Sequence, residues 1–162
     1  MIPPFQGMLK IRIEAEVNPS EDPEKVKRAI GNVFGKEAAS NIGVERGKAI
    51  YILDSYRGLT KVYEQVRHKR TLAVLRRLLT KNREEGGTWF YLNKQAAFVG
   101  KVVLCEEAQE SPLGPIKVSI ETNDVDGLIE WLAPKEEFLR RKDVRRRRKS
   151  SLRKADTNTF FS

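Results

Sequence analysis

Apolar and charged residues alternate strictly near the start of the chain. One face of this pattern holds Leu9, Ile11, Ile13, Ala15 and Val17, and the other holds Lys10, Arg12, Glu14 and Glu16. This two-residue period predicts a half-buried β-strand with one face in water. Apolar residues then recur at helical spacing from Val26 to Phe34, after Asp22 and Pro23, which favour a helix start. We expect the first helix over residues 23–34.

The middle of the chain is predicted to contain two helices. They follow an aperiodic loop at 35–47 and a short apolar strand at 48–53. One helical stripe is formed by Leu59, Val62, Tyr63 and Val66, and a second stripe of different direction is formed by Leu72, Leu75 and Leu79. Because the stripe changes direction, two helices fit this region better than one, with Thr71 as the N-cap of the second.

Strand-forming residues dominate the next part of the chain. Three runs rich in aromatic and β-branched residues lie at 88–93, 98–105 and 116–121, and a short helix at 125–132 ends before Pro134. The expected order is strand, helix, strand, two helices, three strands, helix. Such strands with few crossover helices predict an α+β two-layer sandwich, in which a largely antiparallel sheet carries helices on one face.

Positive charge is distributed unevenly along the 162 residues. The chain has a formal net charge of +9, yet residues 1–139 amount to only +1, whereas residues 140–154 hold ten basic residues and one acid. Within the first part, residues 57–83 are net +8 and residues 84–139 are net −7. This polarity fits either intramolecular pairing or a basic surface turned toward phosphates.

Beyond Glu137 large apolar residues are rare, so this region cannot bury enough surface to order itself. The expected organisation is a flexible arm at 1–8, a single α+β domain at 9–136 and a basic, disordered tail at 137–162.

Composition excludes several classes of protein. One Cys and one His cannot form a disulfide framework or a four-ligand zinc site, and we expect no metal and no cofactor. The sequence has no apolar run of the about 20 residues that a membrane helix needs, so we expect a cytoplasmic protein without membrane contact. His68 has no second His to join it and is expected to be a surface residue rather than a catalytic base.

Two groups of basic residues are candidate nucleic-acid contacts. The first is the unbroken run Arg145, Arg146, Arg147, Arg148 and Lys149, whose mutual repulsion would be relieved by phosphates. The second is a basic helical surface that includes Arg67, Arg70, Arg76 and Arg77. The alternatives are a solvated tail for the first group, and for the second a solvated helix face paired with the acids that follow residue 84.

Two polar connections are further candidates. Asn93, Lys94 and Gln95 join two predicted strands and carry side chains able to reach phosphate oxygens and base edges. The proline-containing loop at 111–115 is stiff and precedes the last strand. Either connection could instead be a simple turn. Next to them, Phe90 or Tyr91 could stack bases on an exposed sheet face, but adjacent strand residues face opposite ways, so at most one can do so.

Three blocks of sequence resemble an uncharacterised archaeal protein family, uncharacterised protein family number 0201. They are Phe90-Tyr-Leu-Asn-Lys-Gln-Ala-Ala-Phe-Val-Gly-Lys-Val102, Glu110-Ser-Pro-Leu-Gly-Pro-Ile116 and Trp131-Leu-Ala-Pro134, and the similarity extends from about Leu9 to Pro134. Members of that family resemble the fold of the large-subunit ribosomal protein that binds 5S RNA. The resemblance implies that fold and RNA binding, and it supplies no catalytic residues.

We therefore predict a non-enzymatic RNA-binding protein whose basic residues contact the phosphate backbone of structured RNA. One alternative is a small-molecule-binding protein or enzyme that uses the 93–95 and 111–115 loops. Another is a homodimeric protein-interaction module formed through an uncovered sheet face or edge.

Overall fold

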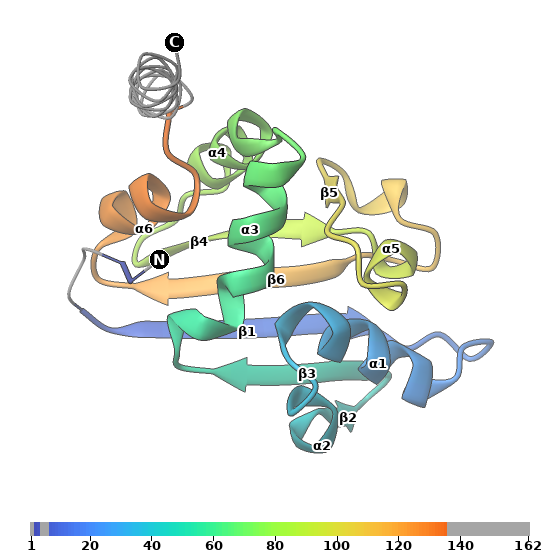
Figure 1. Ribbon diagram of the computed structural model, residues 1–162. Helices are drawn as coiled ribbons and strands as arrows, with labels where there is room; N and C mark the ends of the chain where they lie inside the picture. Colours follow the sequence, from blue (N-terminus) through green and yellow to red (C-terminus); the bar gives the residue numbers. More distant parts are fainter. Residues whose placement is uncertain (1, 4–6, 136–162) are drawn as a thin grey trace, which may run out of the picture.

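The protein is described here by a computed structural model that covers residues 2–3 and 7–135. Its strands are β1 (Leu9–Glu16), β2 (Gly43–Glu45), β3 (Lys48–Leu53), β4 (Gly87–Leu92), β5 (Leu104–Cys105) and β6 (Ile116–Thr122). They form one antiparallel sheet in the order β2-β3-β1-β6-β4-β5 (Figure 1). The expected α+β sandwich with an antiparallel sheet is confirmed.

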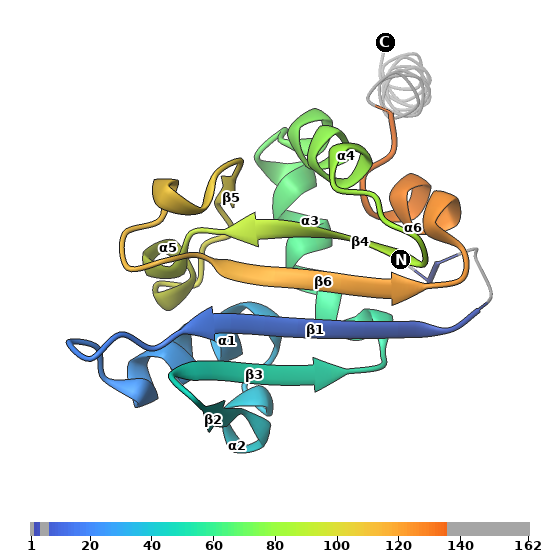
Figure 2. The ribbon, with the colours of Figure 1, turned by 180° about the vertical axis from the view of Figure 1, so that it is seen from behind.

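The helices lie on one side of this sheet. They are α1 (Pro23–Phe34), α2 (Ala38–Asn41), α3 (Thr60–His68), α4 (Leu72–Lys81), α5 (Lys94–Phe98) and α6 (Val125–Leu132), with 3-10 turns η1 (Tyr56–Leu59) and η2 (Ala108–Glu110). Helices α1 and α3 cross one face of the strands, and the opposite face is seen in Figure 2 without a covering helix from the described residues.

Alternating residues of the strands supply the sheet's half of the core. The inward positions with no more than 2% exposure include Ile11 and Ile13 of β1, Phe90 and Leu92 of β4, and Ile116, Val118 and Ile120 of β6. Apolar stripes of α1, α3 and α4 cover them, as the helical periodicity predicts. Asp22 caps α1 as expected, because its carboxylate accepts a hydrogen bond from the N–H of Glu24 at 3.0 Å.

Three local predictions are wrong in detail. The expected loop at 35–47 contains α2 and the edge strand β2, which pairs with β3. The expected strand at 98–105 is reduced to β5, because Phe98 ends α5 and Gly100 turns the chain with a φ of 78°. Thr71 stands at the N-cap of α4, but its hydroxyl donates back to the carbonyl of Val66 instead of capping the helix.

Candidate nucleic-acid interface

The basic segment of α3 and α4 binds the end of α6 rather than facing solvent as a whole. The guanidinium of Arg67 donates to the carbonyls of Trp131 at 2.9 Å and Leu132 at 3.2 Å. It also lies 3.3 Å from the ring centre of Tyr63. Burial lowers the pKa of Arg67, although the group stays charged at any physiological pH. Arg67 thus caps the carboxyl end of α6, where a cation is favourable.

Two further arginines of α4 also have protein partners. Arg76 donates to the carbonyl of Ala133 at 3.2 Å and forms an ion pair with Glu130 at 2.6 Å. Arg77 pairs with Glu106. The basic segment therefore meets the acidic segment that follows it, as the charge pattern allowed. Of the four helical candidates, Arg70 is the one whose exposed guanidinium has neither an ion pair nor a hydrogen bond within the described residues.

Asn93 and Lys94 begin α5 instead of forming a turn between two strands. The Asn93 side chain caps the helix by accepting from the N–H of Ala96 at 2.9 Å. Lys94 is 3% exposed, and its ammonium donates to Glu16 O at 2.9 Å, Glu21 Oε1 at 2.8 Å and Leu113 O at 2.8 Å. All three N–H groups are used, so Lys94 has no donor left for a phosphate.

The carboxylate of Glu21 is the charged partner of Lys94. Burial by itself would raise the pKa of Glu21, but hydrogen bonds from Lys94 and Asn18, together with the charge of Lys94, hold the pKa below its ordinary value. Asn18 also donates to the carbonyl of Leu113 at 2.8 Å. Asn18, Glu21, Lys94 and Leu113 therefore join two separate loops to the start of α5.

The loops at 93–95 and 111–115 converge, as the small-molecule alternative requires. Gln95 donates to the carbonyl of Pro112 at 2.8 Å. Ser111 accepts from the N–H of Lys94 at 3.0 Å and donates to the carbonyl of Gly114 at 3.0 Å. A hollow of about 380 Å³ lies beside them. Lys94, Glu21 and Gln95 use their polar groups within the protein, so these three are poorly placed to orient a ligand there.

The uncovered face of the sheet presents a different set of side chains. Trp89 and Tyr91 of β4 point to this face, whereas Phe90 between them is fully buried. Their rings are neighbours, with centroids 4.9 Å apart. The ammonium of Lys117, on the adjacent strand β6, lies 4.7 Å from the centre of the Trp89 ring. Of Phe90 and Tyr91, at most one was expected to face outward, and Tyr91 is the one that does.

Strand pairing places Trp89 and Tyr91 at the ends of two rows of residues that run across the sheet. One cross-strand row runs Ile52, Arg12, Ser119, Trp89, and the next runs Ile50, Glu14, Lys117, Tyr91. Arg12 pairs with Glu14 at 3.3 Å and is half-exposed, and Ile52 is 51% exposed. The first row lines a hollow of about 300 Å³ together with Lys10 and Lys117. The acids in its lining are Glu84, Glu85 and Glu121. We call Lys10, Arg12, Trp89, Tyr91 and Lys117 the open-face set.

Rings flanked by cations on an exposed sheet suit single-stranded nucleic acid. Every base has a face that can stack on an aromatic ring, and nearby cations contact the backbone. Of the open-face set, the sequence pattern indicated only Tyr91 as a candidate contact and not the other four residues. The alternation at residues 9–17 did place Lys10 and Arg12 on a wet face, but the register that brings β4 and β6 beside them lies in no local pattern.

The run from Arg145 to Lys149 lies outside the described residues. Among the residues that the structure covers, no cluster of His, Cys, Asp or Glu could hold a metal ion. In the same part of the chain no helix has the length and apolar character to cross a bilayer.

Comparison with known proteins adds a family. A family model described as RNA binding matches residues 10–122. A UPF0201 protein from Sulfurisphaera tokodaii is 46% identical over 132 residues, which cover 79% of this chain and 89% of that protein. One from Methanothermobacter thermautotrophicus is 42% identical over 127 residues, covering 78% and 92%. A solved UPF0201 structure from Methanococcus jannaschii, 30% identical, matches 78% of this chain and 93% of its own with a TM-score of 0.61. This chain therefore belongs to the family described as RNA binding, alongside the archaeal UPF0201 proteins.

Proposed function

We propose that the protein binds RNA through the uncovered face of its sheet, with bases stacked on Trp89 and Tyr91. The observation that carries this proposal is a pair of neighbouring rings on a sheet face that no helix within residues 7–135 covers, with Lys117 over one of the rings. A stacked base would bury the exposed part of each ring, and Lys117 is placed to contact a phosphate beside it.

The basic residues differ in whether they are available to contact RNA. Arg67, Arg76, Arg77 and Lys94 have partners within the protein, and so they are poor candidates for phosphate contacts. Lys10, Arg70 and Lys117 remain available in the domain. The basic run from Arg145 to Lys149 adds phosphate contacts in this scheme, and such contacts strengthen binding without reading sequence.

The protein's two tryptophans make the proposal directly testable. Trp89 is half-buried on the open face, whereas Trp131 is 6% exposed on the helix side. Titration with a single-stranded RNA should therefore quench the emission of Trp89. In a Trp89→Phe variant the remaining Trp131 emission should not respond, although RNA still binds.

Affinity provides the second readout. Replacing Trp89 by Ala should weaken binding by about 1–3 kcal/mol, which is the usual value of one base–aromatic stack. Tyr56→Leu, which removes an aromatic ring from the helix side, is the matched control and should leave the affinity unchanged. Equal affinities of W89A and Y56L for the RNA would show that the sheet face does not bind it.

A second copy of the chain is the competing occupant of the same face. Light scattering at the concentrations of the titration distinguishes the two cases. A mass of two chains that falls to one chain in W89A would show that the face is a dimer interface, and the proposal would then be wrong.

A further inference from the structure

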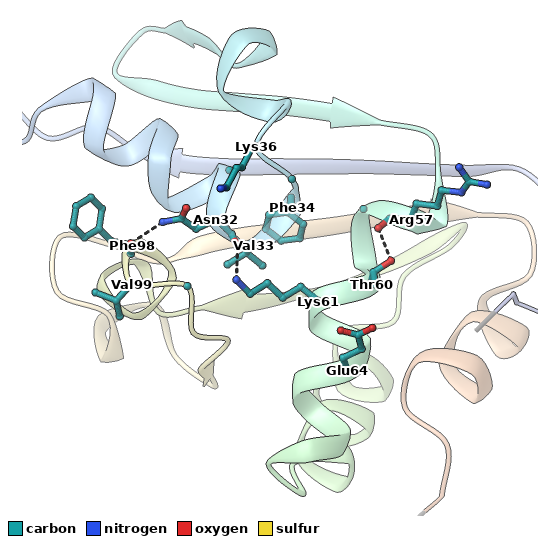
Figure 3. Close-up of a pocket in the computed structure, with 14 residues that line it drawn as sticks. Asn32, Val33, Phe34, Lys36, Arg57, Thr60, Lys61, Glu64, Phe98 and Val99 are labelled. Carbon is teal, nitrogen blue, oxygen red and sulfur yellow. Dashed lines mark hydrogen bonds between the residues drawn. The ribbon is translucent and has the colours of Figure 1, made fainter.

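A second concave site lies on the helix side, away from the open-face set. Three structural elements enclose a pocket of about 550 Å³, namely the end of α1, the η1–α3 junction and the end of α5 (Figure 3). A pocket of this size can hold a ligand of nucleotide dimensions. Its charged lining residues are Lys36, Arg57, Lys61 and Glu64, so the lining is net positive.

The walls of this pocket are held by side-chain to backbone hydrogen bonds. Asn32 donates to the carbonyl of Phe98 at 2.7 Å, and Lys61 donates to the carbonyl of Asn32 at 2.7 Å. Gln65 of α3 fixes the segment that follows α5, because its amide donates to Gly100 O and accepts from the N–H of Val102. The cavity is therefore defined by three elements that are bonded to one another.

Two ammonium groups converge in the pocket. In Figure 3 the side chains of Lys36 and Lys61 point toward Asn32 from opposite sides, while the guanidinium of Arg57 points away. Lys61 uses one N–H on Asn32 O and keeps two for a ligand. Lys36 is exposed and has no ion pair or side-chain hydrogen bond within the described residues. A Cβ on Gly100 would lie 3.2 Å from the Lys61 ammonium, so a glycine there leaves this group room.

Two ammonium groups favour an anionic ligand, and the rest of the lining indicates which chemical groups accompany that anion. Val99 is 65% exposed and lines the pocket, where it offers an apolar surface to a ring. Thr60 begins α3 just before Lys61, and Glu64 lies one turn later. Both line the pocket and can accept hydrogen bonds from hydroxyl groups. We propose that this pocket binds a ribonucleotide phosphate, with the phosphate between Lys36 and Lys61. The ribose hydroxyls then lie toward Glu64.

Such a group has two sources, a free nucleotide or the phosphorylated end of an RNA. Calorimetry of the full chain with AMP, and with adenosine as the phosphate-free probe, tests the first source. A short RNA with a 5′-phosphate, compared with the same RNA with a 5′-hydroxyl, tests the second. The proposal expects AMP to bind more tightly than adenosine, or the phosphorylated end more tightly than the hydroxyl end.

Lys36→Gln should weaken that phosphate-dependent binding by on the order of tenfold, the value of one charge-assisted hydrogen bond. Lys25→Gln removes an exposed cation from α1, outside this pocket, and is the matched control. Equal effects of the two variants, or no preference for phosphate in either comparison, would overturn the proposal. W89A should leave AMP binding unchanged, so failure of the sheet-face proposal is distinguished from failure of this one.

Discussion

Replacing Lys94 by Met tests whether this residue is part of the structure rather than of an RNA surface. The side chains of Lys94 and Glu21 are 4% and 13% exposed, so the ion pair is largely removed from water. Methionine keeps the length of the apolar stem and removes the ammonium. The carbonyls of Glu16 and Leu113 then lose a donor, and the carboxylate of Glu21 remains buried without its cation.

Breaking a buried ion pair from one side typically costs about 3–5 kcal/mol. Glu21 keeps two hydrogen bonds from Asn18, at 3.1 Å to its backbone N–H and 2.7 Å to its side chain, so the lower end applies. We expect K94M to lose about 3 kcal/mol, which for a chain of this length is a fall in Tm of about 6–12 °C. Urea unfolding followed by circular dichroism measures the free energy directly.

The double variant Glu21→Gln/Lys94→Met identifies the cause. Removing the unpaired charge should recover part of the loss, because a neutral amide is cheaper to bury than a carboxylate. The pH dependence gives an independent check. The folded-state pKa of Glu21 is depressed, so its contribution to wild-type stability is present above its ordinary pKa of 4.5 and is lost as the pH falls through the folded-state value. A K94M loss below about 1 kcal/mol at neutral pH would refute the reasoning, because that is the value of an exposed pair.

Three further predictions concern other parts of the fold. Arg67→Met should lower the free energy of unfolding by about 2 kcal/mol, because two carbonyls at the end of α6 lose a charged donor, and chemical denaturation measures this. Gly87→Ala should cost about 1–3 kcal/mol, since a Cβ there collides with the carbonyl of Ile120 on the paired strand; a stability equal to wild type would contradict the β4–β6 register. Cys105 is buried, and burial followed by the charge of Glu110 raises the pKa of its thiol, so a maleimide should label it slowly in native protein and rapidly in urea.

Periodicity predicted the elements whose two faces differ most in polarity. The alternation from Leu9 to Val17 correctly predicted β1 and which of its residues face inward. The apolar spacing after Pro23 predicted α1 with the same first and last residues as observed. The change of stripe between Val66 and Leu72 correctly separated α3 from α4. In each case local sequence and tertiary packing favour the same structure.

The predictions failed where tertiary bonds determine the local conformation. Residues 98–105 are rich in strand-forming side chains, but Gln65 of α3 bonds to the backbone of Gly100 and Val102, and this holds most of the segment outside the sheet. Lys94 looked like a surface cation because its partner Glu21 is 73 residues away in sequence. The expected resemblance to the 5S-RNA-binding ribosomal protein stays a prediction.

The charge balance of the domain determines how RNA binding should respond to salt. Residues 1–139 have a net charge of only +1, and their basic and acidic segments pair with each other, so long-range attraction for phosphates is weak in this part of the chain. Stacking on Trp89 and Tyr91 is insensitive to salt, whereas each phosphate neutralised on a single strand contributes a log–log slope of about −0.7. Truncation after Leu139 should therefore flatten the salt dependence while the effect of W89A persists. If truncation leaves the slope unchanged, the phosphate contacts come from the domain, and Lys10, Arg70 and Lys117 become the residues to replace next.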